Sequence, residues 1–251
     1  MKFGGTSVGS PSAIKKVGAV VRDAARKNNV AVVVSAFAGV TDALLECLRL
    51  AEKNILLSVK KLAVLKRRHL LAVEELVANA ARRNEEAAFT EKTFRELTRV
   101  LEKVARAKRA DDRLRDVGLS AGEILSAHIV AAHIGGTFVD ARPLIKTDDS
   151  FTNAAVDFAA TNTRIRKSFR PSSVIPVITG FIGSTSEGQT TTLGRGGSDY
   201  TASIFGAALG VKLIEIWTDV SGIMSADPRI VPTARIIPRV SYDEAVEMAY
   251  F

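Results

Sequence analysis

The chain is poor in the residues that cross-link small secreted folds or bind metal ions. Only one cysteine, Cys47, occurs among the 251 residues, so no disulfide can form within the chain. The three histidines show no metal-ligand spacing with cysteine or acidic partners, which favours structural roles for them. A single thiol is compatible with a reducing compartment, and we expect a cytoplasmic protein.

Long hydrophobic runs and aromatic clusters are also missing. No apolar stretch reaches the length that we expect of a membrane-spanning helix, and the N-terminus runs straight into Gly4 and Gly5 rather than into a signal peptide. Aromatic residues make up 6% of the chain and do not interleave with its basic runs as a nucleic-acid stacking surface requires. We therefore expect neither a membrane nor a nucleic acid as partner.

The formal net charge of +8 would suit a polyanionic partner. Much of the excess, however, lies in helical stretches such as 60–68 and 106–115, where basic residues alternate with leucine, alanine and valine. Such runs more often form the solvated face of a helix than a nucleic-acid site. Nucleic-acid binding is therefore a minor alternative, which a steep loss of binding with salt would support.

Strand-like and helix-like segments alternate along the chain. Continuous apolar runs at 30–34 and 174–179 are typical of strands buried on both faces. Shorter strands are expected at 1–3, 137–140, 151–158 and 211–217. The alternation predicts an α/β fold, a three-layer α/β/α sandwich with a mainly parallel central sheet.

The stretch from about 42 to 117 is expected to be almost entirely helical. Leucine and alanine recur at spacings of three and four, and neither proline nor glycine occurs between 42 and 115. The pattern predicts two or three helices, broken near Asn54 and Asn84. Because this block is too long for one crossover helix, we predict a helical insertion within a single domain that spans 1–251.

Several helix starts carry recognisable caps. Ser10 followed by Pro11 predicts a helix that begins near residue 11, and 241–244 match a capping box. Ser120 with Glu123 matches a capping box too and predicts a helix over 120–134. Glu123 would then be either a capping partner or a carboxylate that faces a pocket and binds an ammonium group.

The most informative stretch is the glycine-rich loop at 190–201, between an expected strand and a helix expected at 198–209. Its glycines allow close approach of a ligand, and the helix N-terminus favours an anion. Arg195 adds a planar cation suited to a carboxylate or phosphate. Asp199 beside that anion site makes sense if a cation, such as Mg²⁺ or a substrate ammonium, also binds there. A plain turn with Ser198 as N-cap explains the pattern equally well.

Small-residue loops near Gly4, Ser35, Gly180 and Thr218 each follow an expected strand. In parallel α/β sheets, ligands bind beyond the carboxyl ends of the strands, so these loops should meet at one edge and form the active site. The 35–41 loop would bind a second substrate through hydroxyl and N–H groups, or would merely cap the next helix. The segment after the last of these strands equally suits an ordinary turn.

Lys2 lies at the end of the first expected strand, beside the glycine pair. From there a lysine can reach phosphate oxygens and offset charge during phosphoryl transfer. The alternative is an exposed lysine near a chain end. A Walker A loop is absent, because Gly-x₄-Gly-Lys-Ser/Thr does not occur.

Six segments follow one another along the chain: 2–7, 35–41, 122–123, 180–183, 192–199 and 218–223. Together they resemble the aspartate kinases of the amino-acid kinase superfamily, and the likeness covers essentially the whole chain. Any one segment alone would carry little weight. The resemblance implies the amino-acid kinase fold and phosphorylation of the L-aspartate side-chain carboxylate to 4-phospho-L-aspartate. ATP and Mg²⁺ would be needed, in the first step of lysine, methionine and threonine biosynthesis.

The resemblance also implies residue roles by motif position. Lys2 would contact the transferring phosphate, and Asp199 would organise the phosphoryl site through the metal or through Lys2. Aspartate would be bound by Thr41, Glu123, Arg195, Gly196, Gly197 and Ser198. The nucleotide would be bound by Lys2, Phe3, Gly4, Gly5, Thr218, Asp219, Met224 and Arg229. Among these, Arg195 would hold a carboxylate of aspartate and Glu123 its amino group.

The chain departs from the family pattern in three respects. Only Met1 precedes Lys2, where relatives have a longer first strand, and Met224 stands where many relatives carry a nucleotide-contacting tyrosine. The family's Gly-Ala-Lys segment, whose lysine helps hold ATP phosphates, and the regulatory ACT domains are expected beyond 251. Two alternatives remain: a kinase for glutamate or a nucleoside monophosphate, and a binding domain without turnover. A homodimer is the expected assembly.

Overall fold

The computed structural model describes residues 1–169, 174–220 and 222–250. Ser221, in the last of the six family-like segments, lies outside this range. The chain forms two compact units, Met1–Trp217 and Thr218–Phe251. The single domain spanning 1–251 stays a prediction.

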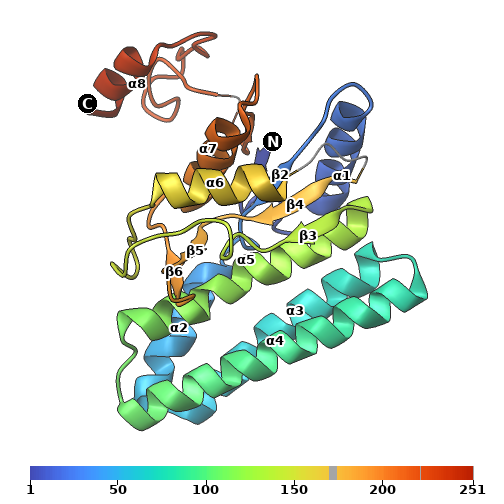
Figure 1. The fold of residues 1–251 in the computed structure, drawn as a ribbon, viewed down its shortest axis with the longest axis vertical. Coiled ribbons are helices and arrows are strands. Elements are labelled where there is room, and N and C mark those ends of the chain that lie inside the picture. Colours follow the sequence, from blue (N-terminus) through green and yellow to red (C-terminus); the bar gives the residue numbers. More distant parts are fainter. Residues whose placement is uncertain (170–173, 221, 251) are drawn as a thin grey trace. The chain divides into compact units, whose positions relative to one another are not determined.

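A parallel five-stranded sheet forms the centre of the first unit. Its strand order is β3 (Thr137–Val139), β4 (Pro176–Thr179), β2 (Val32–Val34), β1 (Lys2–Phe3) and β7 (Ile216–Trp217) (Figure 1). Phe3 is in register with Val34 and Trp217, and Val34 with Thr179. These four strands therefore end at one edge of the sheet.

Helices cover both faces of this sheet. On one face lie α1 (Pro11–Ala25) and α5 (Asp112–Ile134), and on the other α6 (Phe158–Ser168) and α7 (Gly197–Leu209) (Figure 1). The side chains of β2 alternate between two cores: Val32 and Val34 belong to one, and Val33 belongs to the other. The three-layer α/β/α prediction is confirmed.

The predicted helical block contains α2 (Val40–Lys53), α3 (Ile55–Leu76) and α4 (Ala80–Ala107), with α3 and α4 side by side (Figure 1). The predicted break at Asn54 is confirmed, because its side chain caps α3 by accepting from a backbone N–H. The break expected at Asn84 is wrong. Asn79 caps α4 instead, accepting from the N–H of Arg82 at 3.0 Å.

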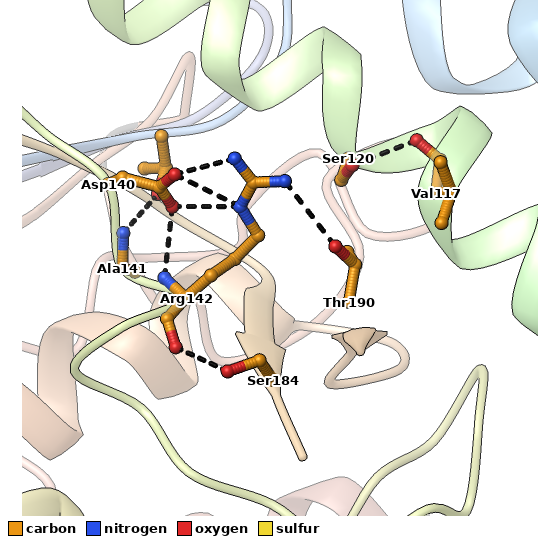
Figure 2. Close-up of polar contacts among 8 residues, drawn as sticks. Val117, Ser120, Asp140, Ala141, Arg142, Ser184 and Thr190 are labelled. Carbon is orange, nitrogen blue, oxygen red and sulfur yellow. Dashed lines mark hydrogen bonds and ion pairs between the residues drawn. The ribbon is translucent and has the colours of Figure 1, made fainter. Parts of the chain in front are cut away.

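The start expected for the next helix is also wrong. α5 begins at Asp112, and the side chain of Asp111 caps it by accepting a backbone N–H at 2.7 Å. Ser120 lies inside the helix and donates to the carbonyl of Val117 at 2.9 Å (Figure 2), so it forms no capping box with Glu123. The expected end of the insertion, near residue 117, falls within α5.

One helix does have the length and apolar composition of a membrane span, contrary to the sequence prediction. It is α5, and 72% of its apolar window is buried inside the protein. It contacts β2, β3 and β4. Such burial is typical of a core helix that lies against a sheet.

A hairpin that was not predicted from the sequence includes the first residues of the glycine-rich loop. Its strands are β5 (Ile182–Ser184) and β6 (Thr190–Thr192), which pair antiparallel. Arg142 holds the hairpin, as Figure 2 shows. Its guanidinium pairs with Asp140 at 2.6 Å and donates to the hydroxyl of the first residue of β6. Its carbonyl accepts from the hydroxyl of the last residue of β5 at 2.6 Å.

Two expected strands are shorter than predicted or missing. The run at 211–217 contributes only β7. Within 151–158, all of which the structure describes, the backbone forms no strand, and Val156 makes only an isolated bridge with Thr147. Short apolar runs therefore overstated the extent of the sheet.

The second unit contains α8 (Tyr242–Tyr250). Its capping box is confirmed. The Ser241 hydroxyl accepts from the N–H of Glu244 at 3.2 Å, and the Glu244 carboxylate accepts from the N–H of Ser241 at 2.7 Å. The reciprocal pair fixes the start of the helix.

Candidate active site

A cavity of about 320 Å³ lies beyond the carboxyl ends of β1, β2 and β4. Five separate segments of the chain form its wall: the loops after these three strands, α5, and the glycine-rich loop with the start of α7. The lining residues are Lys2, Gly5, 35–39, Thr41, Asp42, Glu123, Phe181, Gly194 and 196–199. The prediction that the first three small-residue loops meet at one edge is confirmed. The fourth loop, at Thr218, belongs to the second unit.

Lys2 and Asp199 form an ion pair in the cavity wall. The Nζ atom of Lys2 lies 2.7 Å from Oδ1 of Asp199. Lys2 is only 8% exposed because β1 lies between β2 and β7. A buried ammonium is costly without a compensating charge, which Asp199 supplies from the first turn of α7. Asp199 was expected to organise the site either through a metal ion or through Lys2, and the structure shows the contact with Lys2.

Two helices start at the cavity without a side-chain cap. They are α2, which follows Gly39, and α7, which follows Gly196; the φ angles of these glycines are 75° and 70°. All the other helices in the described parts of the chain have a serine, asparagine or aspartate acceptor at their start. Uncapped N-termini leave backbone N–H groups available to an anion. The cavity is therefore suited to phosphate and carboxylate groups.

The alternatives that assigned capping roles to the loop serines and threonine are wrong. Ser198 is the second residue of α7 rather than its N-cap, and it is buried in the cavity wall. Thr41 is likewise the second residue of α2, and neither it nor Ser35 caps that helix. All three side chains belong to residues that line the cavity. Their hydroxyl groups remain candidates for substrate binding.

Glu123 contributes a buried carboxyl group from α5. Its side chain is 3% exposed, and Oε1 accepts from the backbone N–H of Ala36 at 3.2 Å. Oε2 is buried and has no hydrogen-bond partner among the described residues. Burial raises the pKa of Glu123 and the hydrogen bond from Ala36 lowers it; burial has the larger effect, and the resulting pKa is about 8. A cationic group in the cavity would compensate this carboxylate.

Arg195 lies in the glycine-rich loop, between Gly194 and Gly196 of the cavity wall. Its side chain is exposed and does not line the cavity. Within the parts of the chain that are described, the guanidinium makes no hydrogen bond or ion pair. Because no carboxylate of the described residues neutralises it, this cation is available to an anionic ligand.

The predicted nucleotide residues of the first unit occupy different environments. Gly4 lies beside Lys2, since a Cβ on it would lie 3.5 Å from the lysine Nζ. Phe3 is buried, and its ring stacks on Trp217 with centroids 5.9 Å apart. Its side chain therefore serves the core, which leaves only its backbone for contact with a nucleotide.

The other predicted nucleotide residues lie in the second unit. The Thr218 hydroxyl donates to the carboxylate of Asp219 at 3.1 Å. Arg229 forms a bidentate pair with Asp227, with a shortest distance of 2.6 Å. Met224 forms an isolated bridge with Ile236. Their roles at a nucleotide stay predictions.

The structure also reveals site residues that sequence reasoning did not single out. Phe181 lines the cavity with a φ of 69°, a strained conformation for a bulky residue that is found at functional sites. Asp116 is fully buried and accepts from the N–H and the hydroxyl of Thr192, at 2.9 and 2.7 Å. Asp116 thus anchors the start of the glycine-rich loop. Its place about two helical turns before Glu123, on the same face of α5, was the available signal.

Comparison with known proteins identifies the class of this fold and site. The family model described as Amino acid kinase family matches residues 1–251, and the chain belongs to that family. Among curated relatives, "Aspartokinase 1, chloroplastic" of Arabidopsis thaliana is 35% identical, over 100% of this chain and 45% of the relative. "Lysine-sensitive aspartokinase 3" of Escherichia coli (strain K12) is also 35% identical, over 100% and 55%. The chain spans about half the length of these relatives.

Solved structures give the same result. E. coli aspartokinase III in complex with aspartate and ADP (R-state) matches with a TM-score of 0.87 at 33% identity, over 100% of this chain and 55% of that chain. Its complex with lysine and aspartate (T-state) matches with a TM-score of 0.88, also at 33% identity, over 100% and 56%. The resemblance to the aspartate kinases is confirmed.

Proposed function

We propose that this chain carries the catalytic site of an aspartate kinase, which phosphorylates the side-chain carboxylate of L-aspartate with ATP to give 4-phospho-L-aspartate. This reaction begins the route to lysine, methionine and threonine. The observation that carries the proposal is the composition of one cavity. It combines the Lys2–Asp199 pair, two uncapped helix N-termini and the buried, half-unpaired carboxyl of Glu123.

Phosphoryl transfer to a carboxylate needs positioning and charge neutralisation more than covalent help. The acceptor is already ionised at neutral pH, so no general base is required. One carboxylate oxygen of aspartate bonds to the γ-phosphorus of ATP as the bond between that phosphorus and the ADP oxygen breaks. Lys2, held by Asp199, and the N-termini of α2 and α7 supply positive charge where charge shifts during transfer.

The substrate is proposed to be an amino acid because the cavity and the glycine-rich loop beside it offer opposite charges. The Glu123 carboxylate suits an ammonium group, and Arg195 suits a carboxylate. A nucleoside monophosphate has no ammonium to compensate Glu123. Glutamate carries the same groups as aspartate with one more methylene, so the length of the cavity must separate these two substrates.

Mg²⁺ is the proposed cofactor, and the cavity offers the hard oxygen donors that it prefers. Asp42 and Asp199 both line the wall. No group of three or more histidine, cysteine, aspartate or glutamate residues is arranged to bind a metal among the described residues. Mg²⁺ usually keeps several water ligands and is coordinated by one or two carboxylates together with substrate phosphates. We therefore propose that it binds together with ATP. A homodimer and a cytoplasmic location stay predictions.

ADP release by the purified chain, with Mg²⁺ and ATP, tests the proposal when L-aspartate, L-glutamate and a nucleoside monophosphate are compared. We expect release that depends on L-aspartate and is at least tenfold slower with the others. Equal or faster release with either competitor would assign a different amino-acid kinase activity. Binding of ATP and aspartate without any release would favour a binding domain without turnover.

A further inference from the structure

Arg68 links the helical block to the cavity. It lies on α3 and is half-buried. One terminal nitrogen of its guanidinium donates to the carbonyl of Ala38 at 2.9 Å, and the other donates to the carbonyl of Gly9 at 2.7 Å. One planar group therefore bridges two backbone carbonyls from different parts of the chain.

These carbonyls belong to the loops that follow the adjacent strands β1 and β2. The loop after β1 is 4–10 and the loop after β2 is 35–39, and both contribute to the cavity wall. The loops also bond directly, since the N–H of Ala38 donates to the carbonyl of Gly5 at 3.0 Å. Arg68 thus closes a second connection between them, on the side of α3.

The same turn of α3 holds an aromatic residue of the cavity. The His69 ring stacks on the Phe37 ring with centroids 4.9 Å apart and planes 5° apart. The guanidinium of Arg68 lies 5.8 Å from the centre of the same ring. His69 is fully buried, and burial lowers its pKa to about 4, so the stacked imidazole is neutral near pH 7. Two successive residues of α3 therefore fix Phe37.

We propose that Arg68 is a positioning residue that holds the loop after β1 in register with the loop after β2. The first loop adjoins Lys2, and the second leads into α2 and Thr41. The relative position of the two loops therefore determines how the proposed phosphate-binding residues lie relative to the proposed aspartate-binding residues. This inference rests on the proposed kinase function. A displacement of about 1 Å between reacting groups can slow a reaction about a hundredfold. The helical block thereby contributes to catalysis and not only to packing.

The Arg68→Lys variant separates positioning from mere stability. Lysine keeps the charge but lacks the planar fork that reaches both carbonyls. We expect a melting temperature close to that of the unsubstituted chain and a kcat about 10- to 100-fold lower, with a smaller change in either KM. The matched control is Arg67→Ala, which removes an exposed arginine from the preceding position on α3 and should leave kcat unchanged. An unchanged kcat in Arg68→Lys overturns the proposal.

Amide hydrogen exchange of Ala38, followed by NMR, tests the connection without reference to activity. Its N–H lies in the bond between the two loops. We expect at least tenfold faster exchange in Arg68→Lys and no change in Arg67→Ala; equal rates in all three chains overturn the proposal. Absence of aspartate-dependent turnover in the unsubstituted chain would reject the kinase function, while the exchange rates would still decide whether Arg68 holds the loops.

Discussion

Glu123 and Ala36 join the core helix to the cavity loop through one buried hydrogen bond, 3.2 Å from the backbone N–H of Ala36 to the glutamate Oε1. The bond fixes one carboxylate oxygen, and the second has no partner among the described residues. The fold therefore orients the carboxyl group and leaves Oε2 without a hydrogen bond. A substrate ammonium group would donate this missing hydrogen bond.

The raised pKa of Glu123 predicts pH-dependent binding of L-aspartate. Below pH 8 the free site holds a protonated Glu123, while an ammonium ligand favours the ionised form, so binding must release a proton. We expect the Kd for aspartate to fall by up to about tenfold per pH unit between pH 6 and 8. Calorimetry in buffers of different ionisation enthalpy measures both the Kd and the proton release.

Glu123→Gln is the control for this titration, and it should give weak, pH-independent aspartate binding with ATP binding unchanged. The raised pKa of Glu123 also predicts how the stability of the ligand-free protein depends on pH. Because the folded pKa is raised from 4.5, the stability that Glu123 contributes is full below about pH 4.5 and is lost as the pH rises through 8. The ligand-free glutamine variant should therefore melt higher than the unsubstituted chain at pH 8. A pH dependence that survives in the variant would show that another group titrates.

Arg195→Ala should strongly reduce aspartate turnover and leave ATP affinity nearly unchanged. The guanidinium is exposed and has no carboxylate partner among the described residues, so its removal should change the free energy of unfolding little. We expect kcat/KM for aspartate to fall by about a hundredfold or more, since a charged hydrogen bond of about 3 kcal/mol is lost. Arg99→Ala, which removes an exposed arginine of α4, is the matched control. Turnover within twofold of the unsubstituted chain would remove Arg195 from the site.

Asp116 should affect stability in a way that depends on the replacement. Asp116→Ala leaves the part-buried N–H of Thr152 and the buried N–H of Thr192 without an acceptor, at about 1–3 kcal/mol each, so the free energy of unfolding should fall by roughly 2–6 kcal/mol. Asp116→Asn keeps one oxygen for both N–H groups, and its amide can donate to the Thr192 hydroxyl. Burial raises the pKa of Asp116, so loss of its charge costs little. Urea denaturation of both variants measures the free energy of unfolding, and we expect a smaller loss in Asp116→Asn than in Asp116→Ala. Equal losses in the two variants would contradict this account.

Gly196→Ala should lower both stability and turnover. Its φ of 70° is strained for alanine, and the added methyl group would enter space that the structure leaves open at the cavity. The matched control is Gly210→Ala, at the other end of α7 with a φ of 62°. The two variants should lose similar melting temperature, but only Gly196→Ala should lose turnover. Equal activity of both would mean that the start of α7 does not bind a ligand.

The location of the site could be predicted from the sequence because it depends on topology alone. Once the strands are parallel, loops such as those after Phe3 and Val34 must lie at one edge, whatever the details of packing. The glycines at 194–197 added the position of a helix start. No contact geometry was needed for either step.

The features that escaped prediction depend on distant contacts or on competing local signals. Asp111 and Ser120 are both good cap residues, and only packing shows that Ser120 instead donates within the helix. The partners of Arg68 lie 30 and 59 positions away in sequence, so its bridge is invisible in local patterns. The same holds for Asp116 and Thr192, 76 positions apart.

The central claim, phosphoryl transfer to the side-chain carboxylate of L-aspartate, is tested most directly by trapping the product. The purified chain is incubated with Mg²⁺, ATP, L-aspartate and hydroxylamine, and the aspartyl hydroxamate is identified by mass spectrometry. We predict hydroxamate on the side-chain carboxyl in proportion to the ADP released, and its loss when L-aspartate is omitted. ADP release without hydroxamate, or hydroxamate on the α-carboxyl, would contradict the account.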